Sequence, residues 1–320
     1  MRLYLPNSAF LGNFEAFVRQ IDLTDPDSLA VTANSKWISV HPAVLAMVAA
    51  LAQLSKPSQI TCEAFQAKSA HYFERMGLFQ YLHQKSGINI NEHDSTGRFI
   101  PITQIKDSDT LSRFITDMIP LLHLAPEYAE PIRYIVSELV RNVLEHSYSP
   151  HGAFVAAQYY KKSNAIRIGI ADTGIGVRKS ITRSHAASDD LAALRLALTP
   201  GITGTTSREG GTEYNAGAGL FFTKSIATVN RDFFIIYSGT ALYKLLKSKS
   251  KKRLVLNADP FRDRHSSLTD LPEWPGTVVG IDLALHANEA FSELLDRIRE
   301  TYSEAVRARR KERQRRPKFS

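Results

Sequence analysis

The chain has 320 residues, of which 43% are apolar, and a formal net charge of +8. This length can bury the cores of two domains, and the apolar content is ordinary for a globular protein. The longest apolar stretch, Ala43–Leu54, is too short to span a bilayer, and the N-terminal residues lack a signal-peptide pattern. A single cysteine, Cys62, excludes an internal disulfide framework and a cysteine-based zinc cluster. We therefore expect a cytoplasmic protein with no membrane partner.

Residues 1–95 are predicted to form a small α/β domain, because β-like runs (LAVTA, KWISV, QITCEAF) alternate with helical patterns. The element order and the Phe-x-x-Met-Gly-Leu-Phe-x-x-Leu pattern of Phe73–Leu82 resemble STAS domains, the fold of anti-anti-sigma factors. In phosphorylated STAS domains a Ser or Thr opens the helix after the second strand. Here Ser39 could serve, although Pro42 is typical of the first turn of a helix. Residues 96–112 are expected to be a linker.

The segment Ser137–Ser147 predicts an amphipathic helix with two distinct faces. One face is an apolar stripe at helical spacing, formed by Ile135, Val136, Leu139, Val140, Val143 and Leu144. Glu138, Asn142 and His146 recur every four residues and therefore share another face. His146 can act chemically or simply cap the helix C-terminus.

Two glycine turns follow this helix along the chain. The alternating run Ala165–Ala171 predicts a strand that ends in Asp172-Thr-Gly-Ile-Gly, where the glycines Gly174 and Gly176 permit a tight turn. The segment Asn215–Asn230 places glycines directly before an apolar helical run. Backbone N–H groups at such a helix start can approach a phosphate, and the helix dipole favours its negative charge. A carboxylate, an amide and these turns together predict a site for a metal and a nucleotide.

The order Glu-x-x-x-Asn, Asp-x-Gly-x-Gly, Gly-x-Gly-Leu resembles the GHKL superfamily, the ATP-binding fold of gyrase B, MutL, sensor histidine kinases and anti-sigma-factor kinases. The resemblance covers Leu111–Leu285 and implies a GHKL (Bergerat) α/β sandwich, to which we assign residues 113–287. It implies ATP and Mg²⁺ as the bound groups.

The resemblance also implies a role for each matching residue. Asn142 would ligate the magnesium ion, and Glu138 would be the general base that orients water or a hydroxyl nucleophile. Asp172 would accept a hydrogen bond from the adenine amino group. The other cofactor-binding candidates lie around the base and the phosphates: Gly174, Gly176, Asn215, Gly217, Gly219, Leu220, Lys224 and Thr277. Lys224 can equally be a surface residue, and Asn215 the end of a loop.

Residues 288–320 are predicted to form a docking helix followed by a basic tail. From Ala305 to Ser320 eight Lys/Arg accompany one acid, Glu312, so this stretch carries +7 of the net charge of +8. We expect the tail to be frayed or disordered. A solubilising role and contact with nucleic acid or another acidic partner stay as alternatives.

The sequence thus favours a Mg-ATP-binding protein that hydrolyses ATP slowly as a conformational switch on a regulatory partner protein. Sensor histidine kinases commonly lack a glutamate at the position of Glu138, which leans the chain toward an ATPase or a Ser/Thr protein kinase. A histidine autokinase is the least favoured class, because the sequence shows no two-helix dimerisation segment carrying a phosphoacceptor histidine ahead of the domain. The alternatives are a Ser/Thr protein kinase of the anti-sigma-factor kinase type, acting on a STAS-like or other partner, and a non-catalytic, nucleotide-dependent interaction module. A homodimer stays open.

Overall fold

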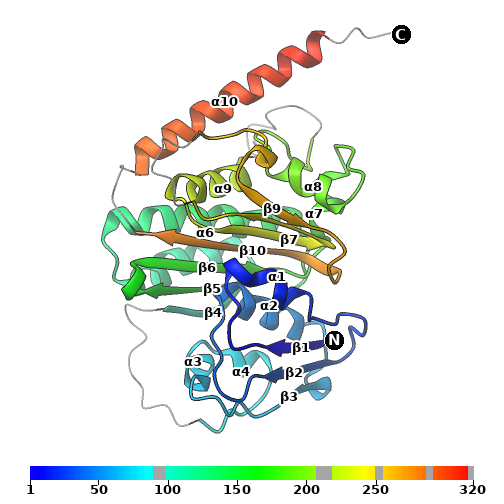
Figure 1. Ribbon diagram of the computed structural model, residues 1–320, viewed down its shortest axis with the longest axis vertical. Coiled ribbons are helices and arrows are strands. Elements are labelled where there is room, and N and C mark those ends of the chain that lie inside the picture. Colours follow the sequence, from blue (N-terminus) through cyan, green and yellow to red (C-terminus); the bar gives the residue numbers. More distant parts are fainter. Residues whose placement is uncertain (89–98, 207–217, 249–254, 286–290, 316–320) are drawn as a thin grey trace.

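The computed structural model describes residues 1–88, 99–206, 218–248, 255–285 and 291–315, and they form a mixed α/β protein with two sheets (Figure 1). The expected α/β class is confirmed. The first sheet is parallel, in the order β1 (Arg2–Leu5), β2 (Leu29–Ala33), β3 (Ile60–Cys62). The second has seven strands, every neighbouring pair antiparallel, in the order β4 (Phe99–Ile105), β5 (Ala153–Tyr160), β6 (Ala165–Ala171), β10 (Trp274–Ala284), β7 (Phe234–Gly239), β8 (Ala241–Leu245), β9 (His265–Leu268).

Ten α-helices are assigned in the described part of the chain, and they fall into two groups. The N-terminal group is α1 (Phe14–Val18), α2 (Pro42–Ala52), α3 (Ala70–Arg75) and α4 (Leu78–Tyr81). The later group is α5 (Ser108–Arg113), α6 (Pro126–His146), α7 (Gly176–Ile181), α8 (Asp190–Ala197), α9 (Gly219–Asn230) and α10 (Phe291–Arg315). No helix in the described ranges is long and apolar enough to cross a membrane.

Helix α6 covers one face of the seven-stranded sheet through its predicted apolar stripe. All of that stripe is buried except Leu144, which is half-buried. The stripe joins α9, α10 and the inward residues of β5 and β6 in one apolar core. Each fully buried aliphatic side chain contributes about 1.5–3 kcal/mol relative to exposure, so this packing fixes the rotation of α6 about its axis. The polar face carrying Glu138 is thereby directed away from the stripe.

The N-terminal unit covers the opposite face of the same sheet. Helix α2 lies between the two sheets (Figure 1), and all eleven of its residues are buried. A helix that is apolar all round is expected in such an interior position. Gly169 on β6 allows the close contact, because a Cβ there would lie 2.0 Å from the backbone nitrogen of Ala43. The two predicted α/β units therefore share one apolar core through this face, which combines α2 with Phe154, Ala171, Tyr237 and Val278.

The expectation of a linker over 96–112 is wrong for its described part. Residues Phe99–Ile105 form β4, the edge strand that pairs with β5. Pro101 is compatible with an edge strand because one side of that strand needs no ladder hydrogen bonds. Residues Ile100, Ile102 and Ile105 are buried, so the segment has the apolar anchors that a linker lacks.

Two further expectations differ from the structure. The KWISV run forms no strand, and Val40 makes only an isolated bridge with Ala9. The C-terminal segment expected to be frayed is helical as far as Arg315, because α10 continues through the basic residues. Its first part packs against α6 and α9, and its last part extends beyond the rest of the molecule (Figure 1).

Candidate functional site

A cavity of about 340 Å³ lies among α6, the end of β6, α7 and the start of α9. It is on the sheet face that α6 covers, opposite the N-terminal unit. Its walls are formed by both polar and apolar side chains from segments far apart in the sequence. The structure brings seven of the predicted residues into this one cavity: Glu138, Asn142, Asp172, Gly176, Gly219, Leu220 and Thr277.

The α6 wall follows the predicted four-residue spacing. Tyr134, Glu138, Asn142 and His146 all line the cavity. Burial raises the pKa of Glu138, against the opposing effect of Arg141, so its carboxylate is a stronger proton acceptor than an exposed glutamate. The side-chain nitrogen of Asn142 is buried and has no hydrogen-bond partner in the described part of the chain. An unpaired buried amide is costly, which marks this position as one that a ligand would complete.

Gly219 brings the N-terminus of α9 against this wall. A Cβ at Gly219 would lie 2.7 Å from Glu138 Oε2 and 3.2 Å from Asn142 Nδ2, so only glycine fits without displacement. No side-chain cap bonds the first turn of this twelve-residue helix among the described residues. The helix start therefore presents backbone N–H groups and a positive dipole end beside the carboxylate and the amide.

Asp172 lies at the end of β6 and is held through its backbone. Its N–H donates to the carbonyl of Thr277, its carbonyl accepts from the indole Nε1 of Trp274, and both distances are 2.9 Å. Its Oδ1 accepts the N–H of Gly174 at 2.7 Å. Its Oδ2 is buried without a partner among the described residues. Burial raises the pKa of Asp172 to about 7, although the backbone hydrogen bonds from Gly174 and Thr277 oppose the rise.

The two glycines of the Asp172 turn have different surroundings. Gly176, with φ of +77°, lines the cavity and opens α7, as expected for a residue that shapes the wall. Gly174 does not line the cavity. A Cβ there would lie 2.1 Å from the carbonyl oxygen of Ser147, so Gly174 instead lets the turn pack against the end of α6. Its predicted place on the cavity wall is wrong.

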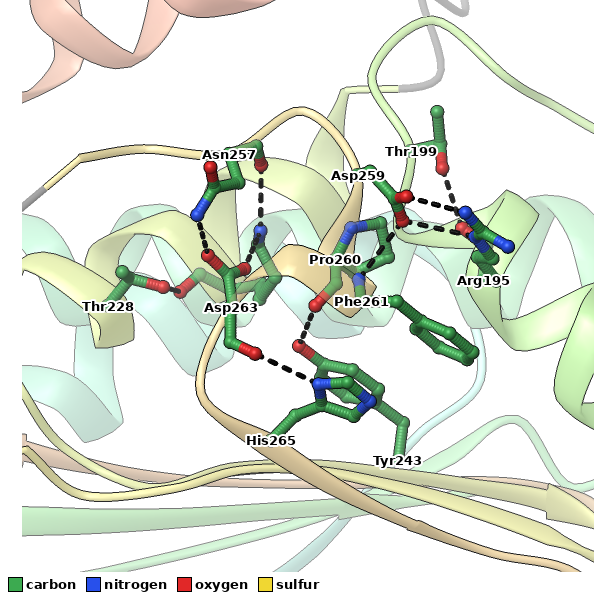
Figure 2. Close-up of polar contacts among 11 residues, drawn as sticks. Arg195, Thr199, Thr228, Tyr243, Asn257, Asp259, Pro260, Phe261, Asp263 and His265 are labelled. Carbon is green, nitrogen blue, oxygen red and sulfur yellow. Dashed lines mark hydrogen bonds and ion pairs between the residues drawn. The ribbon is translucent and has the colours of Figure 1, made fainter.

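Lys224 is not a surface residue, and it does not line the cavity. It is fully buried and forms an ion pair with Asp263, and its Nζ also donates to the carbonyl of Asn257 at 3.2 Å. Burial lowers the pKa of Lys224, whereas Asp263 opposes that effect. Figure 2 shows Asp263 and Asn257 turned toward each other, beside the stacked rings of Tyr243 and His265. The lysine ammonium is therefore held by this polar cluster.

Two predicted residues, Asn215 and Gly217, lie outside the residues that the structure describes. Conversely, the cavity includes residues that sequence reasoning missed. Tyr134 is one helical turn before Glu138, so the four-residue spacing could have identified it. Thr203 and Gly204 had no such signal, because their segment reaches the cavity only through tertiary packing against Ser180.

Neither a protein-family model nor a curated protein matches this chain. Among the described residues, no group of three or more His, Cys, Asp or Glu side chains is placed to hold a metal ion. Within the described part of the chain, the cavity combines one unpaired carboxylate oxygen, one unpaired amide nitrogen, a glutamate with a raised pKa and a helix start without a side-chain cap.

Proposed function

We propose that this chain is a Mg-ATP-binding protein of the GHKL class, with a STAS-like N-terminal unit, that hydrolyses ATP slowly. The observation that carries the proposal is the meeting of Asp172, Asn142, Glu138 and the start of α9 around one cavity. The antiparallel sheet with helices on the cavity side is compatible with a GHKL sandwich.

The residues present fit an adenine nucleotide. Asp172 Oδ2 is a buried acceptor that has no partner among the residues the structure describes, and the adenine amino group is a donor that would satisfy it. The uncapped N-terminus of α9 suits a chain of phosphates, because its N–H groups and dipole favour anions. Gly219 keeps this approach clear of a side chain.

A magnesium ion also fits, held chiefly by the nucleotide. Mg²⁺ in nucleotide sites is usually bound by one or two protein oxygens together with phosphates and waters, so a dedicated acidic cluster is not required. Asn142 would supply the protein ligand through its side-chain oxygen. When bound, the ion would neutralise phosphate charge.

Glu138 would act on the attacking group. Its carboxylate faces the cavity next to the start of α9, and its raised pKa makes it a better proton acceptor than an exposed glutamate. A positioned base contributes typically 10²–10⁴-fold to a rate, and electrostatic positioning of phosphates contributes further. The hydrolysis cycle would serve as a switch on a regulatory protein partner.

A Ser/Thr protein kinase of the anti-sigma-factor kinase type is the second candidate, because Glu138 could equally orient a hydroxyl of a partner, STAS-like or otherwise. Phosphorylation within this chain is disfavoured. Ser39 and the start of α2 lie on the sheet face opposite the cavity, with His41 fully buried there. The substrate would therefore be a separate protein. The third candidate, a non-catalytic interaction module, requires binding without turnover.

Incubation of the purified protein with γ-labelled ATP, with and without products of neighbouring genes, separates these candidates. Free labelled phosphate supports hydrolysis, and label retained on a partner supports the kinase. Measurable binding with neither product supports the interaction module. If calorimetry detects no magnesium-dependent ATP binding, the proposed function is wrong.

A further inference from the structure

The start of β10 holds both backbone polar groups of Asp172. Thr277 accepts its N–H and Trp274 donates to its carbonyl. Gly276, between these two residues, permits the approach, because a Cβ there would lie 2.3 Å from the Asp172 carbonyl oxygen. The pairing of β10 with β7 is irregular between Trp274 and Thr277, which lets the Trp274 ring reach across to β6.

The indole of Trp274 belongs to the core on the other side of the sheet. Trp274 is 1% exposed and packs on Tyr237, with 6.2 Å between ring centroids. Both rings are part of the apolar core that contains α2 and the rest of the N-terminal unit. The indole therefore packs in the core that the sheet shares with the N-terminal unit, and its N–H bonds the residue that faces the cavity.

The Trp274 bond is made to the backbone of Asp172, next to the turn that holds its side chain. An indole has one donor and no acceptor, so its loss would leave the Asp172 carbonyl buried without the partner that it now has. That carbonyl belongs to the peptide unit that leads into the turn. The N–H of Gly174, which fixes Asp172 Oδ1, follows directly after it. Rotation of the peptide would move Oδ1 and with it the unpaired Oδ2.

We propose that Trp274 is a positioning residue for the nucleotide site, through which the core of the N-terminal unit holds Asp172 Oδ2 toward the adenine; this inference rests on the proposed function. It gives the N-terminal unit a role at the cavity although the two lie on opposite faces of the sheet. A change in that unit that displaces the Trp274 indole from the Asp172 carbonyl would lower nucleotide affinity.

The first test uses Trp274→Phe, which keeps an aromatic ring and removes the donor. We expect the dissociation constants of ADP and ATP to rise by the same factor, about threefold to tenfold, the usual effect of one lost hydrogen bond. Tyr237→Phe is the matched control, since it removes a hydroxyl in the same core that donates to Pro272 and does not contact Asp172. The inference is supported if the two variants lose similar thermal stability and only Trp274→Phe loses nucleotide affinity.

The second test needs no change at Trp274. The chain has two tryptophans, and the other, Trp37, is 53% exposed. In a Trp37→Phe protein Trp274 is the only indole, and ADP should shift its fluorescence emission. A tryptophan that only fills the core would not respond.

Each outcome decides the inference. Unchanged ADP affinity in Trp274→Phe, or unchanged emission in Trp37→Phe while ADP binds, would overturn it and leave the proposed function intact. If Trp274→Phe does not fold, the emission measurement decides alone. If the unaltered protein binds neither ADP nor ATP, the proposed function fails and the inference fails with it.

Discussion

The first residue of α9, Gly219, lies directly against the carboxylate of Glu138 on α6. A Cβ at Gly219 would be 2.7 Å from Glu138 Oε2, which is closer than real Cβ contacts occur. The atom that must yield is the far end of a flexible side chain, so the fold can accommodate the change by moving the carboxylate. This contact therefore links the identity of one glycine to the position of the proposed base.

Gly219→Ala should consequently reduce turnover more than it reduces stability. Alanine in place of glycine reduces the conformational entropy of the unfolded chain by about 0.4–1 kcal/mol where the backbone conformation is compatible, which offsets part of the strain. We expect ATP turnover to fall by roughly tenfold or more, as for a misplaced catalytic group, while the midpoint of thermal unfolding stays within a few degrees. Gly12→Ala is the control, because its added Cβ would approach nothing closer than 3.6 Å. Equal turnover in the two variants would contradict this account.

Glu138→Gln tests the proposed base directly. The amide keeps the size of the side chain but cannot take up a proton, so turnover should fall by about 10²–10⁴ with ATP affinity retained. Glu130→Gln, on an exposed position of the same helix, should leave both quantities unchanged. A steady-state phosphate-release assay with parallel calorimetry measures the two effects. Full turnover in the Glu138 variant would exclude it as the base.

Asp172→Asn should weaken nucleotide binding and stabilise the protein at alkaline pH. The folded-state pKa of about 7 is above the ordinary 3.8, so the unfolded chain binds fewer protons between these values. The contribution of Asp172 to the free energy of unfolding therefore falls as pH rises from about 4 to about 7. The loss is up to about 4 kcal/mol, because a shift of one pKa unit corresponds to 1.36 kcal/mol. Asparagine does not ionise, so the Asp172→Asn variant avoids this cost. Measured by chemical denaturation, its free energy of unfolding relative to the unaltered protein should be higher at pH 8 than at pH 4. ATP affinity should fall at least about tenfold, since a charge-assisted hydrogen bond is lost. If the difference in free energy of unfolding between the variant and the unaltered protein did not change with pH, the raised pKa of Asp172 would be contradicted.

Lys224→Ala should affect stability and leave the affinity of the folded protein for ATP nearly unchanged. Removal of one partner from a buried ion pair typically costs about 3–5 kcal/mol, because the other charge stays buried. The cost follows from the pairing with Asp263. A Lys224→Met/Asp263→Leu double variant should recover part of the stability measured by urea unfolding. Loss of ATP binding in a fully folded Lys224 variant would restore the phosphate-contact interpretation.

Deletion of residues 307–320 should remove seven net positive charges and leave the cavity intact. The cut follows Val306, which is buried, and keeps Tyr302 packed on Phe221 and Phe222. ATP binding and thermal stability should be nearly unchanged. If the basic end of α10 contacts nucleic acid, the intact protein should show DNA or RNA affinity that falls steeply with salt, and the deletion should abolish it. Absence of such affinity at low salt would leave the solubilising or acidic-partner alternatives.

The parts of the site that could be predicted are those within one element or one turn. The helical period alone places Glu138, Asn142 and His146 on one face of α6, and the cavity confirms that alignment. The strand–turn pattern likewise locates Asp172 at the end of β6. Neighbouring residues in a regular element share a face whatever surrounds them, so the amino-acid order determines this much directly.

Tertiary packing decided the rest, because it depends on partners far along the chain. Lys224 follows a glycine turn, as a phosphate ligand would. In the structure it instead forms a buried ion pair with Asp263, 39 residues later. Gly174 packs against the end of α6, and Phe99–Ile105, expected to belong to a linker, completes a sheet whose other strands begin some fifty residues later. The amino-acid sequence by itself determined which side chains can act together on α6 and at its following turn. Only the fold decided which charges are neutralised in the interior and which remain free to meet a ligand, since burial removes the water that would otherwise solvate them.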